Sequence, residues 1–100
     1  MFSRLLQLLH PNDIAVDLDK TLAKESKFAG TTVIGPPIPA MVERVKKMLA
    51  DGEDVRIFTA RIANDKSGAA RKAIEEWCRK YIGEVLPITD LKDDGMKVLY

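Results

Sequence analysis

The segment that most constrains this chain is residues 14–21, Ile-Ala-Val-Asp-Leu-Asp-Lys-Thr, a short apolar run that ends in two carboxylates one residue apart. Its apolar part is rich in strand-forming residues, is too short for a helix and follows a turn-forming Pro-Asn-Asp cluster at residues 11–13. We therefore predict a buried strand. A strand that ends in Asp-x-Asp brings its acids to the carboxyl edge of a sheet, where open α/β sheets bind their ligands.

The rest of the chain alternates between helix and strand patterns. We predict helices over about residues 38–51 and from an N-cap at Asp65 or Ser67 to about residue 81. Further strands are predicted over residues 55–58, 84–89 and 96–100. The strand over residues 84–89 tolerates Pro87 best if it lies at a sheet edge or if its pairing ends there. This alternation is typical of βαβ units with right-handed crossovers. The predicted fold class is α/β, a Rossmann-like three-layer sandwich with a mostly parallel sheet.

Each predicted helix has one apolar face, which we expect to form the core together with the strands. On the first helix, this face consists of Ile38, Val42, Val45 and Leu49; on the second, it consists of Ala70, Ile74, Trp77, Cys78 and Tyr81.

Length and charge point to one soluble domain over residues 1–100, beginning with an N-terminal helix or extension at residues 1–12. The 16 basic and 15 acidic residues give a net charge of +1 without a block of like charge, which favours neither a nucleic acid nor an anionic membrane as partner. No apolar run approaches the roughly 18 residues of a membrane span. The single cysteine, Cys78, excludes an intramolecular disulfide and fits a reducing cytosol, so we predict a cytoplasmic protein.

Residues 20–37 form a long irregular stretch rich in Gly, Thr and Pro. A loop of this length in a small domain is usually functional or disordered. Because it begins directly at the two acids, we interpret it as a functional flap.

The acids suit two kinds of chemistry. On a straight strand, Asp17 and Asp19 would point the same way and repel each other, whereas a bend after Asp17 would separate them. The pair suits Mg²⁺, which prefers oxygen ligands and bridges carboxylates to phosphates. Alternatively, one carboxylate attacks phosphorus while the other transfers a proton. Phosphoryl transfer also needs donors and cations, which Thr59, Arg61 and Lys92 would supply after the second and third strands.

These residues resemble two motifs of the haloacid dehalogenase (HAD) superfamily of phosphatases and related hydrolases. Residues 17–21, Asp-Leu-Asp-Lys-Thr, resemble its first motif, Asp-x-Asp-x-Thr. Residues 57–59, Ile-Phe-Thr, resemble its second motif, an apolar run closed by Thr or Ser, and residues 57–61 are similar to small, capless bacterial and phage members. The resemblance covers roughly residues 13–100 and implies a HAD-like core.

The resemblance also implies a function, that of a Mg²⁺-dependent phosphomonoester hydrolase. Asp17 would be the nucleophile that forms an aspartyl-phosphate, and also a Mg²⁺ ligand. Asp19 would be the general acid/base, with its backbone carbonyl on the metal. Thr59 would bind phosphoryl oxygens, and Lys92 would be the third-motif lysine that stabilises the charge on Asp17 and phosphate. Lys97, inside the last predicted strand, is the less favoured candidate for that lysine.

Three more residues complete the expected site as substrate-binding groups: Lys20, Thr21 and Arg61. Lys20 occupies a position that is often Gly in the family, so a bulky cation would stand at the bend. Arg61 has two interpretations, binding substrate or pairing with a nearby acid. No insertion is long enough for a cap domain, which implies an open site. Such a site suits a phosphorylated small molecule or polynucleotide end, or coverage by a second subunit in a homo-oligomer.

The fourth family motif, one or two acids that complete the Mg²⁺ shell, would follow Tyr100, where the sequence ends. Asp93 and Asp94 lie before the last predicted strand instead. We therefore expect either a chain truncated before this motif or a natural variant with weakened metal binding, and in both cases poor or absent catalysis from these residues alone. An alternative hypothesis is a catalytically silent module of the same fold that binds phosphate or Mg²⁺. A third is that the acids only solubilise the sheet edge.

Overall fold

The computed structural model describes residues 14–25, 30–91 and 98–99. Within these residues, the chain forms strands β1 (Ile14–Asp17), β2 (Val55–Phe58), β3 (Ile88–Thr89) and β4 (Val98–Leu99). It also forms helices α2 (Pro39–Ala50) and α3 (Ala69–Tyr81) and a short 3-10 helix, η1 (Ala60–Ile62). The α/β prediction is confirmed, whereas the predicted helix or extension at residues 1–12 lies outside the described residues.

The four strands form one parallel sheet in the order β3-β2-β1-β4. Val16 lies opposite Ile57, and Asp17 lies opposite Phe58. From β1, the chain adds β2 and β3 on one side and then returns to place β4 on the other side of β1. The strand order therefore reverses at β1, whose carboxyl end lies at the switch point of the sheet.

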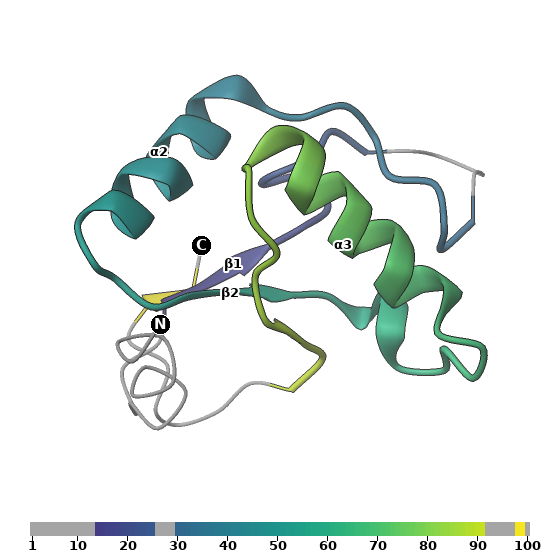
Figure 1. Cartoon of the computed structure of the whole chain (residues 1–100). Helices are drawn as coiled ribbons and strands as arrows, with labels where there is room; N and C mark the ends of the chain where they lie inside the picture. The colour runs from purple at the N-terminus through teal and green to yellow at the C-terminus, as the bar shows by residue number, and fades with distance from the viewer. Residues whose placement is uncertain (1–13, 26–29, 92–97, 100) are drawn as a thin grey trace.

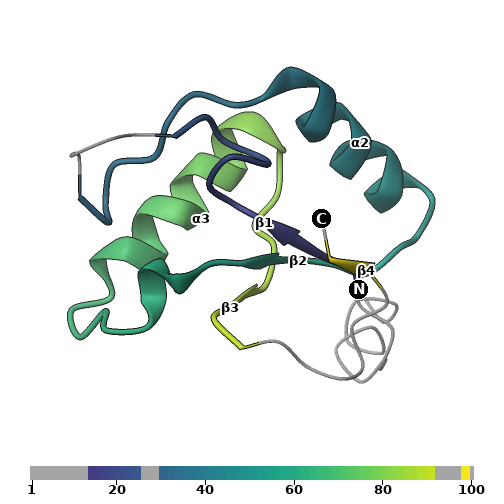
Figure 2. The same ribbon diagram turned by 180° about the vertical axis from the view of Figure 1, so that it is seen from behind.

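Helices α2 and α3 pack on one face of this sheet, above β2 in the views of Figure 1 and Figure 2. Two successive right-handed crossovers in the same direction place both helices on the same face. The strand and helix residues share one core, which includes Ile14, Val16, Val55 and Ile57 from the strands, Val42 and Val45 from α2, and Ile74, Trp77 and Cys78 from α3. Among the described residues, a sheet and one helical layer are observed, so the third layer stays a prediction.

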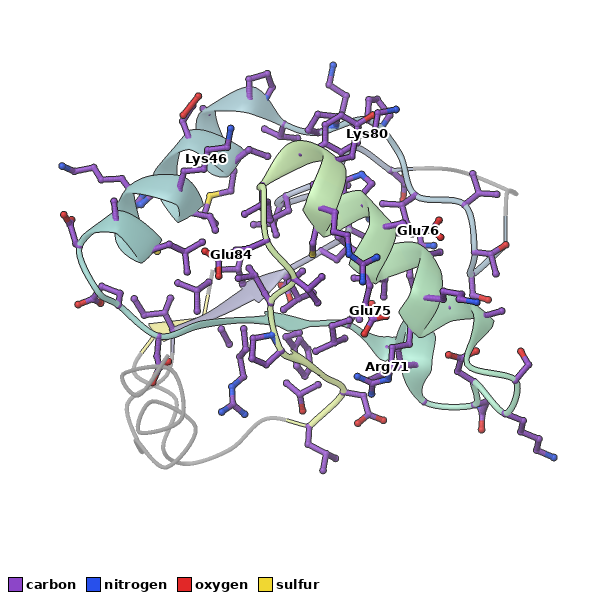
Figure 3. All side chains as sticks on the ribbon, viewed as in Figure 1. Lys46, Arg71, Glu75, Glu76, Lys80 and Glu84 are labelled. Atoms are coloured by element: carbon purple, nitrogen blue, oxygen red, sulfur yellow. The ribbon has the colours of Figure 1, made fainter. Side chains whose placement is uncertain are left out.

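The helix boundaries follow local signals in the sequence. Helix α2 begins with Pro39 at its first turn and ends before Gly52, which has a φ of 84°. The N-cap residue of α3 is Gly68 and not Asp65 or Ser67 as predicted. Both predicted residues still bind the helix start: the Asp65 carboxylate accepts hydrogen bonds from two first-turn amides, and Ser67 Oγ accepts one from Ala69. The charged side chains of α3 lie on its outer surface, among them Arg71, Glu76 and Lys80 in Figure 3.

The third strand is much shorter than predicted. We expected it over residues 84–89, but only Ile88 and Thr89 pair with β2. Pro87 has no N–H to donate, and its carbonyl accepts from Ile57 at 2.8 Å, so the regular ladder begins just after it. Among the described strands, β3 is at a sheet edge, which confirms the position predicted from the proline.

Candidate functional site

The candidate site lies at the carboxyl edge of β1 and β2. Asp17 is the last residue of β1, and Thr59 directly follows β2. The Leu18 amide donates to Phe58 at 3.3 Å, so the two chains stay side by side one residue beyond the strands. Asp17 is half-buried, and Thr59 is the only buried polar side chain among the described residues, 5% exposed. The predicted nucleophile and phosphate-binding hydroxyl therefore come from adjacent strand ends.

The chain turns sharply after Asp17, as one of the two backbone alternatives predicted. The amides of Leu22 and Ala23 both donate to the Leu18 carbonyl, at 3.0 and 2.9 Å. Lys20 adopts a φ of 68°, the left-handed region that favours glycine. The Lys20 side chain reaches Glu25 at 3.3 Å on the surface.

Arg61 pairs with Asp19 through both arms of its guanidinium. Its Nε donates to Asp19 Oδ2 at 2.9 Å, and its Nη2 donates to Asp19 Oδ1 at 2.7 Å. The guanidinium is positioned from β2, because Thr59 Oγ1 accepts the Arg61 amide at 3.2 Å and so starts η1. Of the two interpretations of Arg61, pairing with a nearby acid is the one observed. Substrate binding by Arg61 stays a prediction.

The remaining guanidinium nitrogen of Arg61 faces the flap. Its Nη1 donates to the carbonyl oxygens of Gly30, Thr31 and Val33, at 3.2, 2.9 and 2.9 Å. The Arg61 side chain is only 12% exposed as a result. Arg61 thus contacts both Asp19 and residues 30–33 of the flap.

The two described arms of the flap, residues 20–25 and 30–37, are tied together and to the domain. Lys24 and Ile38 donate backbone hydrogen bonds to Pro36 and Leu22 at 2.8 and 2.7 Å. Figure 1 shows these arms, purple and blue, at the end of the molecule toward which β1 and β2 point. The described arms of the predicted flap therefore lie together at the carboxyl edge of the sheet.

Gly35 and Trp77 anchor the flap to α3, a contact that the sequence did not reveal. Gly35 is buried, and a Cβ built there would clash with the carbonyl oxygen of Lys24. Its own carbonyl accepts the indole N–H of Trp77 at 3.0 Å. We predicted Trp77 as a core residue, which its 6% exposure confirms, but it also fixes the flap. The Gly-Pro-Pro sequence at residues 35–37 was the only signal of a close backbone approach.

A pocket of about 500 Å³ opens beside Arg61, between the flap and the start of α3. Its volume lies in the usual range for small-molecule sites. Seven of the nine residues that line it have polar side chains: Thr31, Thr32, Arg61, Asn64, Asp65, Lys66 and Ser67, with Ala60 and Ala69 completing the wall.

Six of the predicted site residues lie at this edge or in the turn beside it: Asp17, Asp19, Lys20, Thr21, Thr59 and Arg61. The predicted phosphate-stabilising Lys92 lies outside the described residues, as do Lys97, Asp93 and Asp94. Cys78 is a buried core residue, and burial raises the pKa of its thiol, which keeps it neutral.

The donors expected to hold Mg²⁺ are the Asp17 carboxylate and the Asp19 backbone carbonyl. Both are hard oxygen ligands of the kind that Mg²⁺ prefers, so their chemistry fits the ion. Arg61 engages the carboxylate of Asp19, the residue whose backbone carbonyl is the group expected on the metal. Within residues 14–25, 30–91 and 98–99, no group of three or more His, Cys, Asp or Glu side chains is placed to hold a metal.

No family model matches this sequence, and comparisons with curated proteins and with solved structures found no match either. The HAD resemblance therefore rests on the motif residues of the sequence alone. None of the helices in the described part of the chain is long and apolar enough to cross a membrane.

Proposed function

We propose that the chain is a Mg²⁺-dependent phosphomonoester hydrolase of the HAD type that works through an aspartyl-phosphate on Asp17. One observation carries this proposal: Asp17 ends the strand at which the order of the parallel sheet reverses. Ligands of open α/β sheets bind at that switch point. The residue types gathered there, Asp17, Asp19 and Thr59, are those that phosphoryl transfer needs.

In the first step, a carboxylate oxygen of Asp17 attacks phosphorus, and the bond between phosphorus and the leaving oxygen breaks. Asp19 donates a proton to that leaving oxygen, which departs as an alcohol. The Thr59 hydroxyl, buried between the strand ends, donates to a non-bridging phosphoryl oxygen. The product of this step is a phosphoryl group bound to Asp17.

In the second step, water attacks the phosphorus of the aspartyl-phosphate, and Asp19 accepts the proton of that water. The bond between phosphorus and the Asp17 oxygen breaks, which releases inorganic phosphate and restores both acids. Mg²⁺ held by the Asp17 carboxylate and the Asp19 carbonyl would supply positive charge opposite the phosphoryl oxygens. Lys92 is proposed to add to that charge.

The Asp19–Arg61 pair sets a condition on this mechanism. Both oxygens of Asp19 accept hydrogen bonds from the guanidinium. A protonated Asp19 would place its hydrogen where one of these N–H groups now points, because a carboxylic acid has one oxygen that donates. At least one of the two hydrogen bonds between Arg61 and Asp19 must therefore break before Asp19 can donate a proton.

The same pair favours a second candidate, a silent module that binds phosphate or Mg²⁺ without turnover. If the pair stays closed, Asp19 cannot serve as acid or base, while Asp17 and Thr59 still face a ligand. Binding of Mg²⁺ or inorganic phosphate by calorimetry, with no phosphate released under any condition, would support this candidate over the enzyme.

The proposed hydrolase is tested by replacing the nucleophile. Phosphate release from an aryl phosphate is measured with and without Mg²⁺ for the wild type, Asp17→Asn and the control Glu43→Gln, which changes an exposed acid on α2. We expect slow but Mg²⁺-dependent release from the wild type and the control, and release at background level from Asp17→Asn. Equal turnover by Asp17→Asn would overturn the mechanism.

A further inference from the structure

Arg61 is the most connected polar side chain described at the site. Two of its nitrogens bind Asp19, and the third binds three backbone carbonyls of the flap. This guanidinium therefore connects Asp19 to the three flap carbonyls. The contacts are held in a side chain that is 12% exposed, which limits screening by water.

We propose that Arg61 is a positioning residue that couples the conformation of the flap tip, residues 30–33, to the carboxylate of Asp19. The bidentate contact fixes the plane of the guanidinium, because two parallel N–H groups must meet two oxygens. Once that plane is fixed, Nη1 points at the flap. Asp19 therefore orders a segment that it does not bind directly.

The flap tip needs this cation for a physical reason. The carbonyl oxygens of Gly30, Thr31 and Val33 converge on one nitrogen, all within 3.2 Å. Three carbonyl dipoles that point at one place repel one another unless a positive donor stands there. Nη1 carries two hydrogens, so at least one of them is shared between two carbonyls. Loss of the correctly oriented guanidinium should therefore loosen the flap tip.

This coupling links the acid to the pocket beside it. Thr31 and Arg61 both line the pocket of about 500 Å³, so a change in their contact alters its wall. A cation that takes the carboxylate of Asp19 would compete with Arg61 and loosen the flap. The coupling rests on the contacts of Arg61 alone and does not require that the chain be a phosphatase.

Hydrogen exchange of single amides, followed by NMR on the full chain, tests the coupling. The reporters are the Val33 amide, which donates to Gly30 at 3.4 Å, and the Trp77 indole N–H, which donates to Gly35 at 3.0 Å. The Ile57 amide, which donates to Pro87 at 2.8 Å inside the sheet, reports global unfolding. In Asp19→Ala, we expect the Val33 amide to exchange about fivefold faster or more, a coupling of about 1 kcal/mol, with a smaller change at Trp77 and none at Ile57.

A double-mutant cycle separates coupling from two independent effects. Because Asp19 acts through Arg61, the double variant Asp19→Ala/Arg61→Ala should exchange at Val33 no faster than Arg61→Ala alone. Arg61→Lys keeps the positive charge but loses the planar guanidinium that binds two oxygens at once. The Val33 amide of this variant should therefore still exchange faster than in the wild type. Glu25→Gln, which breaks only the exposed pair with Lys20 in the same flap, is the matched control and should leave Val33 unchanged.

The proposal is overturned if Asp19→Ala leaves the exchange of the Val33 amide at its wild-type rate, or if the two single effects simply add in the double variant. If Asp19→Ala unfolds, as faster exchange at Ile57 would show, Asp19→Asn takes its place. That variant keeps one acceptor oxygen and should give a smaller increase at Val33; an unchanged rate there would overturn the proposal equally. Neither result depends on phosphate release. Failure of the coupling proposal can therefore be distinguished from failure of the proposed hydrolase.

Discussion

The indole N–H of Trp77 donates a hydrogen bond to the carbonyl oxygen of Gly35 at 3.0 Å, and this buried contact joins helix α3 to the flap. The flap is held from its other side by Arg61, which binds carbonyls at its tip. The loop at the carboxyl edge of the sheet is therefore fixed at two points, one in the core and one at the acid pair. The contact in the core gives the first prediction about stability.

Trp77→Phe should lower the free energy of unfolding by about 1 to 3 kcal/mol, because it leaves the buried carbonyl of Gly35 without its donor. Urea unfolding followed by circular dichroism measures the change. Tyr81→Phe is the control: it alters the neighbouring ring, whose centroid lies 5.0 Å from that of Trp77, but spares this hydrogen bond. A loss as small for Trp77→Phe as for the control would show that the contact contributes little.

Gly35→Ala should destabilise the chain by about 2 kcal/mol or more, because the new Cβ would clash with the Lys24 carbonyl oxygen and force the flap arms apart. In Gly30→Ala, the new Cβ would meet no atom within 4 Å, but residue 30 has a φ of +84°. Backbone strain alone should therefore lower the free energy of unfolding by about 1 kcal/mol. Fluorescence of the single tryptophan distinguishes the two variants, since Gly35→Ala alone moves the partner of Trp77. Identical spectra for the two variants would contradict this account of Gly35.

Lys20→Gly should raise the free energy of unfolding by roughly 0.5 to 1 kcal/mol, because glycine adopts the left-handed conformation at residue 20 without strain. Its exposed pair with Glu25 contributes little that could be lost. Lys24→Gly, at a nearby exposed lysine without a positive φ, should instead lower stability by about 0.4 to 1 kcal/mol through the entropy of the unfolded chain. Chemical denaturation measures the free energy of unfolding of both variants. Changes of the same sign in the two variants would contradict backbone strain at Lys20.

Asp65 gives a prediction about pH. The backbone N–H groups of Arg71 and Ala70 hold the pKa of its carboxyl below the ordinary value of 3.8. Its contribution to stability is therefore fully present above that value and is lost as the pH falls through the lower, folded pKa. The difference in unfolding free energy between the wild type and Asp65→Ala should stay constant from about pH 7 to 5 and narrow below about pH 4.

Ser67→Ala is the control for the Asp65 prediction, because its hydroxyl accepts the Ala69 amide at the same helix end without a titrating group. The difference between the wild type and Ser67→Ala should not depend on pH. A gap between the wild type and Asp65→Ala that is equally wide at pH 3 and pH 7 would be inconsistent with a lowered carboxyl pKa.

Most of the fold could be predicted because its signals are local. The strand Val55–Phe58 was predicted with the bounds that it has, and Pro39 and Gly52 marked the ends of α2 to within one or two residues. The third strand was predicted too long, because the strand-forming residues before Pro87 were included although the regular ladder begins only after that proline. The short helix η1 was not predicted, since it depends on the Thr59 hydroxyl accepting the Arg61 amide.

The candidate site was predictable only in part. Asp17 and Thr59 could be placed at one sheet edge because parallel strands end together. The partner of Arg61 could not be predicted, because Asp19 lies 42 residues away and the choice depends on the direction of the guanidinium. The contact between Gly35 and Trp77 is equally distant in sequence and was missed for the same reason.

The most direct test concerns the atom that carries the phosphoryl group. The wild-type protein is mixed with Mg²⁺ and an aryl phosphate, quenched in acid within milliseconds and digested, and the peptide that contains residues 14–20 is sequenced by mass spectrometry. We predict a phosphoryl group on Asp17 in the wild type and none in Asp17→Asn. Phosphate release without any phosphoryl group on Asp17, or a peptide that stays unmodified while no phosphate appears, would contradict the proposed hydrolase.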